Sequence, residues 1–184
     1  MPDLFHADPI PLNRPPDFDM QSWRLKHPPS RVDPVISSII KHMRHDLGFS
    51  RIGGVGYCFG GKFVARFLAS ARGTEEAKER LDVGYVAHPS FTTAEEIRGI
   101  RGPFSIAAAE TDSIFPAEKR RETEEILGEL GDGVPWQICL YSGTAHGFAT
   151  KGDLGDRRSR FAKEAAFEQA VVWFNVWLKD GEEK

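Results

Sequence analysis

The stretch Gly53-Gly54-Val55-Gly56-Tyr57-Cys58-Phe59-Gly60-Gly61 decides the fold of this chain. It joins an apolar run over 52–57 to a segment of helical character over 60–71, with Cys58 at the junction. Residues 56–60 follow the pattern G-x-nucleophile-x-G. This pattern is typical of a nucleophile elbow, a sharp turn between a strand and a helix. Glycines suit such a turn because they have no Cβ. The pattern therefore predicts a strand, a tight turn at Cys58 and a helix.

Strands and helices alternate along the rest of the chain. Short apolar runs predict strands over 81–87, 103–109 and 134–141, and amphipathic patterns predict helices over 117–130 and 160–178. This alternation predicts an α/β fold with a mainly parallel sheet flanked by helices. We expect the last helix to pack through its apolar residues Phe161, Ala165, Ala166, Ala170, Trp173, Phe174 and Trp177.

The N-terminal part has a different character. Residues 1–31 are rich in proline and aspartate and predict irregular structure. Asp33 followed by Pro34 is a helix-start signal, and the apolar face that follows continues to Met43 before Gly48 ends the helix. The length fits a single domain over 1–184, with a solvated tail over 179–184.

Composition excludes several classes of protein. A net charge of −3 gives no reason to expect a nucleic-acid partner. No run approaches the roughly 18 apolar residues of a membrane span, and the N-terminal segment lacks the apolar core of a secretory signal. Two cysteines in different contexts are too few for a disulfide framework, so we expect a cytoplasmic protein.

Reactive side chains follow each predicted strand. Cys58 comes after the first strand, His88 after the second, Glu110 and Asp112 after the third, and His146 after the fourth. Because ligands bind beyond the carboxyl ends of parallel strands, we expect these side chains to meet at one edge of the sheet. The chain order of nucleophile, acid and histidine is that of the α/β-hydrolase triad.

Each member of such a triad has a distinct task. A free thiol is only about a few per cent ionised at neutral pH, so Cys58 needs a base, and His146 is the candidate. Asp112 is expected to fix the orientation of His146, with Glu110 as the competing acid. The backbone N–H of Phe59 is expected to stabilise the oxyanion of the reaction.

The same stretch also satisfies part of a phosphate-binding loop, because Gly56 and the pair Gly61-Lys62 have the spacing G-x-x-x-x-G-K. Such a loop continues with Ser or Thr for the magnesium ion, and here the next residue is Phe63. A dinucleotide-binding fingerprint fails as well, because Phe59 stands where its third glycine belongs. We therefore expect that this loop does not bind a nucleotide.

Other polar residues have structural explanations. His88 either lines the site or is a structural histidine bonded to a loop. His42 and His45 lie three residues apart on a helix without a third ligand nearby, so we expect no metal site. Cys139 lies within an apolar strand and is expected to pack in the core. Lys62 is expected to be a helix-surface charge near the elbow.

The chain resembles the fungal-type branch of the dienelactone hydrolase family in four segments, in order. They are Pro2-Asp3-Leu4-Phe5-His6, Gly54-Val55-Gly56-Tyr57-Cys58-Phe59-Gly60-Gly61-Lys62, Ala87-His88-Pro89-Ser90 and Ala145-His146-Gly147-Phe148. The resemblance implies an α/β-hydrolase fold, a catalytic triad of Cys58, Asp112 and His146, hydrolysis of a small lactone or carboxylic ester, and no metal or organic cofactor. We expect four residues to line the substrate pocket: Tyr57, His88, Phe115 and Phe148.

Members of this family carry further residues before the Pro-Asp-Leu-Phe segment. We therefore expect an N-terminally truncated α/β-hydrolase sheet with the nucleophile strand at its edge. Unpaired backbone groups on an edge strand favour pairing with another strand, which predicts a homo-oligomer formed through this edge. The alternative function is a truncated, catalytically weak or inactive hydrolase scaffold that acts as a binding or dimerisation module.

Overall fold

A computed structural model of the chain describes residues 3–11, 13–69 and 79–179. Backbone contacts separate two compact units, Met1–Phe49 and Ser50–Lys184, where the sequence predicted one domain. The last two residues of the helix predicted over 60–71, and the predicted tail after Lys179, lie outside the described residues.

The first unit holds helix α1 (Met20–Lys26), so irregular structure throughout 1–31 was a wrong prediction. Asp19 caps this helix, because its carboxylate accepts hydrogen bonds from the N–H groups of Gln21 and Ser22. An aspartate in a stretch whose composition predicted a loop is therefore a helix cap.

Helix α2 (Pro29–His45) begins earlier than the predicted start at residues 33–34. Pro29 occupies the first turn, where the missing N–H has no helical partner to lose. Pro34 therefore lies inside the helix instead of opening it. Val32 and Ile40 are buried, in keeping with the predicted amphipathic pattern.

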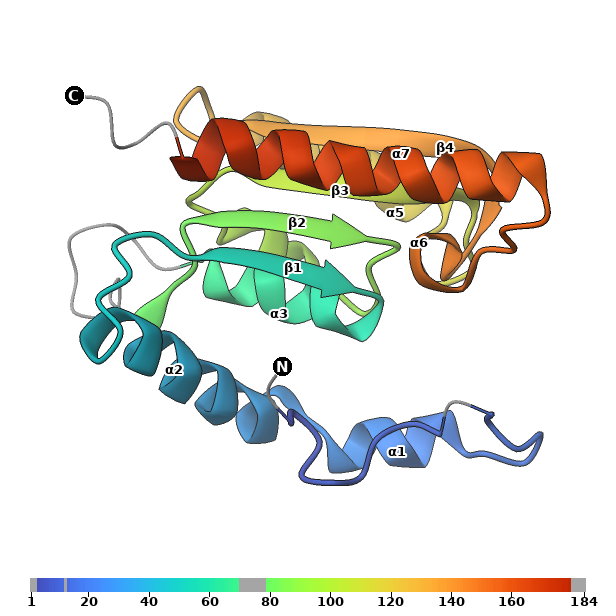
Figure 1. The fold of residues 1–184 in the computed structure, drawn as a ribbon, viewed down its shortest axis with the longest axis horizontal. Coiled ribbons are helices and arrows are strands. Elements are labelled where there is room, and N and C mark those ends of the chain that lie inside the picture. The colour runs from blue at the N-terminus through green and yellow to red at the C-terminus, as the bar shows by residue number, and fades with distance from the viewer. Residues whose placement is uncertain (1–2, 12, 70–78, 180–184) are drawn as a thin grey trace. The chain divides into compact units, whose positions relative to one another are not determined.

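Four parallel strands form the sheet of the second unit, in the order β1-β2-β3-β4 (Figure 1). They are β1 (Gly53–Tyr57), β2 (Val83–Ala87), β3 (Phe104–Thr111) and β4 (Trp136–Ala145). The predicted strands and the edge position of the strand before Cys58 are confirmed. In the part of the chain that the structure describes, β1 pairs with β2 alone; pairing with a second chain stays a prediction.

Helices pack on both faces of this sheet (Figure 1). Helix α3 (Phe59–Phe67) lies on one face, and α7 (Arg157–Phe174), which continues as a π-helix over Asn175–Lys179, lies on the other. The same unit also holds α4 (Ala94–Arg98), α5 (Ala117–Glu129) and α6 (Phe148–Lys151). On the α3 face, a Cβ on Gly84 would lie 2.4 Å from Leu68 and 2.7 Å from Val64, so this helix approaches the sheet closely. Among the described helices, none is both long and apolar enough to cross a bilayer.

Helix α7 packs its alanines, and not its first phenylalanine, against the opposite face of the sheet. Ala162, Ala166 and Ala170 are buried in one cluster with Tyr85, whose hydroxyl donates a hydrogen bond of 2.6 Å to the Ala166 carbonyl. Phe161, which the sequence placed on the packing face, is 68% exposed, so that prediction was wrong. Small side chains let the helix lie close to the sheet, and close packing decides which face is buried.

Candidate active site

The elbow between β1 and α3 presents Cys58 on a strained backbone. Cys58 has φ 51° and ψ −115°, a positive φ that non-glycine residues seldom adopt. Its N–H donates to the Ala87 carbonyl at 3.1 Å, and its carbonyl accepts from the N–H of Gly61 at 3.1 Å. A Cβ at residue 56 would lie 2.6 Å from the Gly60 carbonyl oxygen, so the turn requires Gly56. The strained backbone and these bonds fix the position of the thiol.

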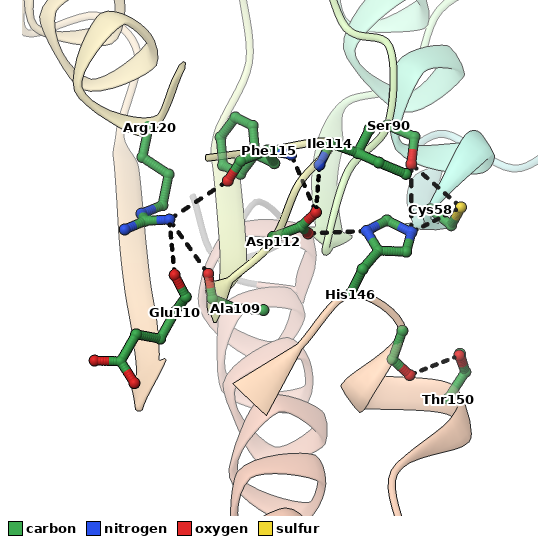
Figure 2. Close-up of polar contacts among 11 residues, drawn as sticks. Cys58, Ser90, Ala109, Glu110, Asp112, Ile114, Phe115, Arg120, His146 and Thr150 are labelled. Atoms are coloured by element: carbon green, nitrogen blue, oxygen red, sulfur yellow. Dashed lines mark hydrogen bonds and ion pairs between the residues drawn. The ribbon is translucent and has the colours of Figure 1, made fainter. Parts of the chain in front are cut away.

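His146 and Asp112 form a continuous hydrogen-bonded chain with this thiol (Figure 2). His146 Nε2 lies 3.1 Å from Cys58 Sγ, and His146 Nδ1 lies 2.8 Å from Asp112 Oδ2. The three residues follow β1, β3 and β4 in the sheet, as the sequence predicted. The Asp112 side chain is fully buried and that of His146 is about a quarter exposed. One end of the chain of bonds is thus shielded from water, while the histidine stays accessible.

Asp112, and not Glu110, is the acid that contacts His146. The second oxygen of Asp112 accepts hydrogen bonds from the Ile114 N–H at 2.8 Å and the Phe115 N–H at 3.1 Å. Glu110 is exposed, and its carboxylate accepts a hydrogen bond from the Gly143 N–H at 2.6 Å. The structure therefore separates two acids that the sequence left in competition.

Arg120 of α5 holds the loop that carries Asp112 (Figure 2). Its Nη1 atom donates to the carbonyls of Ala109, Glu110 and Phe115 at 3.3, 3.5 and 3.4 Å. These contacts join the end of β3 to the turn after Asp112. No pattern in the sequence marks this arginine, which is one of many charges on an amphipathic helix.

The surroundings of the thiol and the imidazole shift their pKa values in opposite directions. Burial acts to raise the pKa of Cys58, but hydrogen bonds from His146 and Ser90 outweigh it, and the pKa is lowered overall. The hydrogen bond to Cys58, followed by that to Asp112, raises the pKa of His146 to about 9 against the opposing effect of burial. Both shifts favour an ion pair of thiolate and imidazolium.

Ser90 completes the immediate surroundings of the thiol. Its Oγ atom lies 3.2 Å from Cys58 Sγ and 3.5 Å from His146 Nε2, and the residue is fully buried. It belongs to the loop after β2, in which His88 and Phe91 have positive φ values of 38° and 60°. Ser90 was not among the predicted site residues, although it comes shortly after a predicted strand, as His88 does.

The four residues expected to line a pocket lie in different places. The His88 ring lies between two other rings, 5.1 Å from that of His146 and 5.8 Å from that of Phe148. Phe148 and His146 also line a hollow of about 200 Å³. Tyr57 lines a separate groove of about 410 Å³, with its ring 6.0 Å from that of His88. Phe115 is buried in the loop that holds Asp112.

Lys62 is not the free surface charge that the sequence predicted. Its Nζ atom lies 2.7 Å from a carboxylate oxygen of Glu96, which also binds Arg66 at 3.0 Å. Lys62 donates a further hydrogen bond of 3.0 Å to the Phe91 carbonyl. The side chains of Lys62 and Glu96 are only 13% and 9% exposed. This ion cluster fastens helix α3 to the loop that carries Ser90.

The remaining candidates are described by their own surroundings. Cys139 is half-buried on β4, and burial raises the pKa of its thiol. His42 and His45 are exposed on α2, as predicted. Within 3–11, 13–69 and 79–179, no three or more His, Cys, Asp or Glu residues are arranged to hold a metal ion.

Comparison with known proteins gives one consistent family. The profile of the dienelactone hydrolase family matches residues 1–178. Hydrolase pyvD of Aspergillus violaceofuscus is 48% identical over 179 residues, which cover 97% of this chain and 69% of that protein. Dienlactone hydrolase 1 of Gibberella moniliformis is 31% identical over 96% of this chain and 67% of its own length.

A solved structure with the same fold comes from a bacterium. A putative dienelactone hydrolase from Klebsiella pneumoniae superposes with a TM-score of 0.62 over 86% of this chain and 68% of its own, at 14% identity. Identity this low supports the fold alone.

Proposed function

The chain belongs to the dienelactone hydrolase family, and from this premise we propose that it hydrolyses a small lactone or carboxylic ester through Cys58, His146 and Asp112. The observation that carries the proposal is the unbroken chain of contacts from Cys58 Sγ to His146 Nε2 at 3.1 Å, and from His146 Nδ1 to Asp112 Oδ2 at 2.8 Å. A nucleophile, a base and a group that orients the base within hydrogen-bond distance are what covalent catalysis requires.

The first half of the proposed reaction forms an acyl-enzyme. The Cys58 proton moves to His146 Nε2, and the thiolate attacks the carbonyl carbon of the substrate. The electron pair of the carbonyl bond moves to oxygen, where the Phe59 N–H at the start of α3 is the proposed donor. When this intermediate collapses, the C–O bond to the leaving group breaks. The leaving oxygen takes the proton from His146, and a thioester remains on Cys58.

The second half releases the acid. His146 takes a proton from water, and the resulting hydroxide adds to the thioester carbonyl. The C–S bond then breaks, the carboxylic acid leaves, and Cys58 returns as a thiolate beside the imidazolium. Asp112 keeps Nδ1 of His146 protonated throughout, which leaves Nε2 to carry the proton in both halves.

Reaction with an activated ester tests the proposal. We expect p-nitrophenyl acetate to release p-nitrophenolate in a burst and to leave one acetyl group on the peptide that contains Cys58, seen by mass spectrometry. Cys58→Ala removes both signals. Cys139→Ala is the matched control, because it deletes the half-buried second thiol on β4 and should leave the burst unchanged.

Absence of an adduct and of turnover in a protein with a cooperative unfolding transition would overturn the proposal. That outcome would favour the alternative of an inactive scaffold that binds or dimerises. Light scattering at micromolar concentration tests the predicted homo-oligomer separately, and a strictly monomeric protein would contradict it.

A further inference from the structure

Among the described residues, Ser90 is a side chain in hydrogen-bond contact with the thiol that the reaction described above does not use. Its hydroxyl is fully buried, and its two hydrogen-bond neighbours at the site are Cys58 Sγ at 3.2 Å and His146 Nε2 at 3.5 Å. Burying a hydroxyl costs free energy unless it forms hydrogen bonds. Figure 2 shows the hydroxyl directed at the sulfur and the imidazole together.

The loop that carries Ser90 is held from two directions. The Ser90 N–H donates to the Cys58 carbonyl at 3.0 Å, so serine and elbow are fixed to each other. Lys62 holds the Phe91 carbonyl at 3.0 Å on the far side. A Cβ on Gly61 would lie 2.9 Å from the Pro89 Cβ, so helix α3 also lies directly against the loop.

Backbone strain on both sides of Ser90 also favours a role in function. His88 and Phe91 have φ values of 38° and 60°, and such conformations cost energy that the surrounding structure must offset. Strained residues of this kind cluster at sites where a side chain must be aimed. Here the strained residues stand on either side of a serine whose hydroxyl faces the thiol.

We propose that Ser90 is a positioning residue for the proposed hydrolase: its hydroxyl donates a hydrogen bond to the Cys58 thiolate and holds the sulfur beside His146 Nε2. This assignment rests on the proposed function. In the ion pair, the Nε2–H donates to the sulfur, and Nδ1–H is committed to Asp112 at 2.8 Å. The sulfur is then the acceptor for the single Ser90 proton. The thiol form is a weak acceptor, so the hydroxyl favours the thiolate.

Several ionisable groups surround this sulfur. His146 faces it from the loop after β4, with Asp112 behind the imidazole and the His88 ring 5.1 Å from that imidazole. Lys62 belongs to α3 but is paired with a carboxylate at 2.7 Å. Ser90 differs from all of these groups because it carries no charge at any pH. Its removal changes the hydrogen bonding of the thiolate without changing the net charge of the site.

Removing the hydroxyl has a distinctive effect on the rate of thiol alkylation. Hydrogen bonds to charged groups are strong enough to shift a pKa by about one unit or more. A higher thiol pKa leaves about tenfold less thiolate on the acidic side, but each thiolate is about threefold more nucleophilic. We therefore expect Ser90→Ala to react with iodoacetamide about threefold more slowly at low pH and about threefold faster at high pH. The two pH profiles should cross.

The experiment measures alkylation of Cys58 against pH in the full chain. Ser105→Ala is the matched control, because Ser105 is also fully buried and hydrogen-bonded, but to Gln137 and Gln169. The control should keep the wild-type midpoint even if it is less stable. Ser90→Thr retains a hydroxyl and should also keep that midpoint. If Ser90→Ala does not fold, the midpoint of Ser90→Thr tests the proposal.

A Ser90→Ala profile that superimposes on the wild type, or that is lower by one factor at every pH, overturns the proposal. A Ser90→Thr midpoint displaced towards that of a free thiol does the same. Alkylation reports on the thiol and not on ester turnover, so the two proposals fail separately. If the wild-type and Ser90→Ala profiles cross but the wild type forms no acetyl adduct, the role of Ser90 is kept and the hydrolase proposal is lost.

Discussion

Acid should destabilise this protein partly through one buried histidine. His88 is 1% exposed, and neither ring nitrogen has a hydrogen-bond partner among the described residues. Burial, with a smaller effect of His146, lowers the pKa of His88 from 6.5 to about 4. Each pKa unit corresponds to about 1.4 kcal/mol, so protonating this ring costs about 3 kcal/mol more in the folded than in the unfolded chain.

The way in which stability changes with pH follows from the direction of the pKa shift of His88. Because the folded-state pKa of His88 lies below the unfolded value, stability is fully present above about pH 6.5 and falls as the pH drops towards 4. At about pH 5, roughly 2 kcal/mol has been lost through this residue. The raised pKa of His146 acts in a different window, where stability is lost as the pH rises from 6.5 towards 9.

His88→Asn removes the titration and suits the backbone, because asparagine tolerates the positive φ of 38° at this position. Urea unfolding followed by tryptophan fluorescence, at about pH 7 and about pH 5, gives the free energy of unfolding of each protein. The wild type should lose about 2 kcal/mol more than the variant between these conditions. The smaller side chain lowers the free energy of unfolding by the same amount at both pH values, so this effect cancels in the comparison.

His45→Asn is the matched control, because it makes the same change of side chain at a histidine that is exposed on α2. Parallel losses of stability in the wild type and in His88→Asn would refute the reasoning. Such a result would mean that the His88 ring is protonated as easily in the folded protein as in the unfolded chain.

Three matched substitutions test other parts of the structure. Asp112→Asn should lower kcat by about 10³- to 10⁴-fold in an ester assay, because the imidazole loses its orienting acid, whereas Glu110→Gln should leave kcat nearly unchanged. Glu96→Gln should lower the free energy of unfolding by about 3 kcal/mol in urea, because it leaves two partly buried cations without their acid. Gly56→Ala should destabilise by about 1–3 kcal/mol through overpacking, while Gly60→Ala, whose Cβ would meet nothing within 4 Å, should not.

The positions of Cys58, Asp112 and His146 at one edge of the sheet could be predicted because each residue directly follows a strand. Parallel topology alone brings the carboxyl ends of strands to one edge, so Cys58, Asp112 and His146 needed no tertiary detail to be placed together. Which of Asp112 and Glu110 contacts His146 depends on how the chain runs at the irregular end of β3. The register of β3 against β4 shifts between Ala109 and Thr111, and no periodic pattern reveals such an irregularity.

Contacts between residues far apart in the chain could not be predicted from the sequence. Ser90 meets Cys58 across 32 positions, and Lys62 meets Glu96 across 34 positions, so neither pair has a spacing that identifies it. The packing face of α7 was mispredicted at Phe161 for a related reason. Hydrophobicity favours burial of the large Phe161 ring, but the helix directs Ala162, Ala166 and Ala170 into the core cluster and leaves Phe161 exposed.

The backbone at Cys58 limits which side chains with a thiol or hydroxyl group fit at this elbow. At φ 51°, β-branched side chains are strongly disfavoured, so threonine is excluded although it carries a hydroxyl. Serine and cysteine lack the branch and bear the same strain. A change from Cys58 to serine would therefore keep the direction in which the side chain points and would alter its acidity. The elbow constrains the shape of the side chain at this position and leaves open whether that side chain ends in sulfur or oxygen.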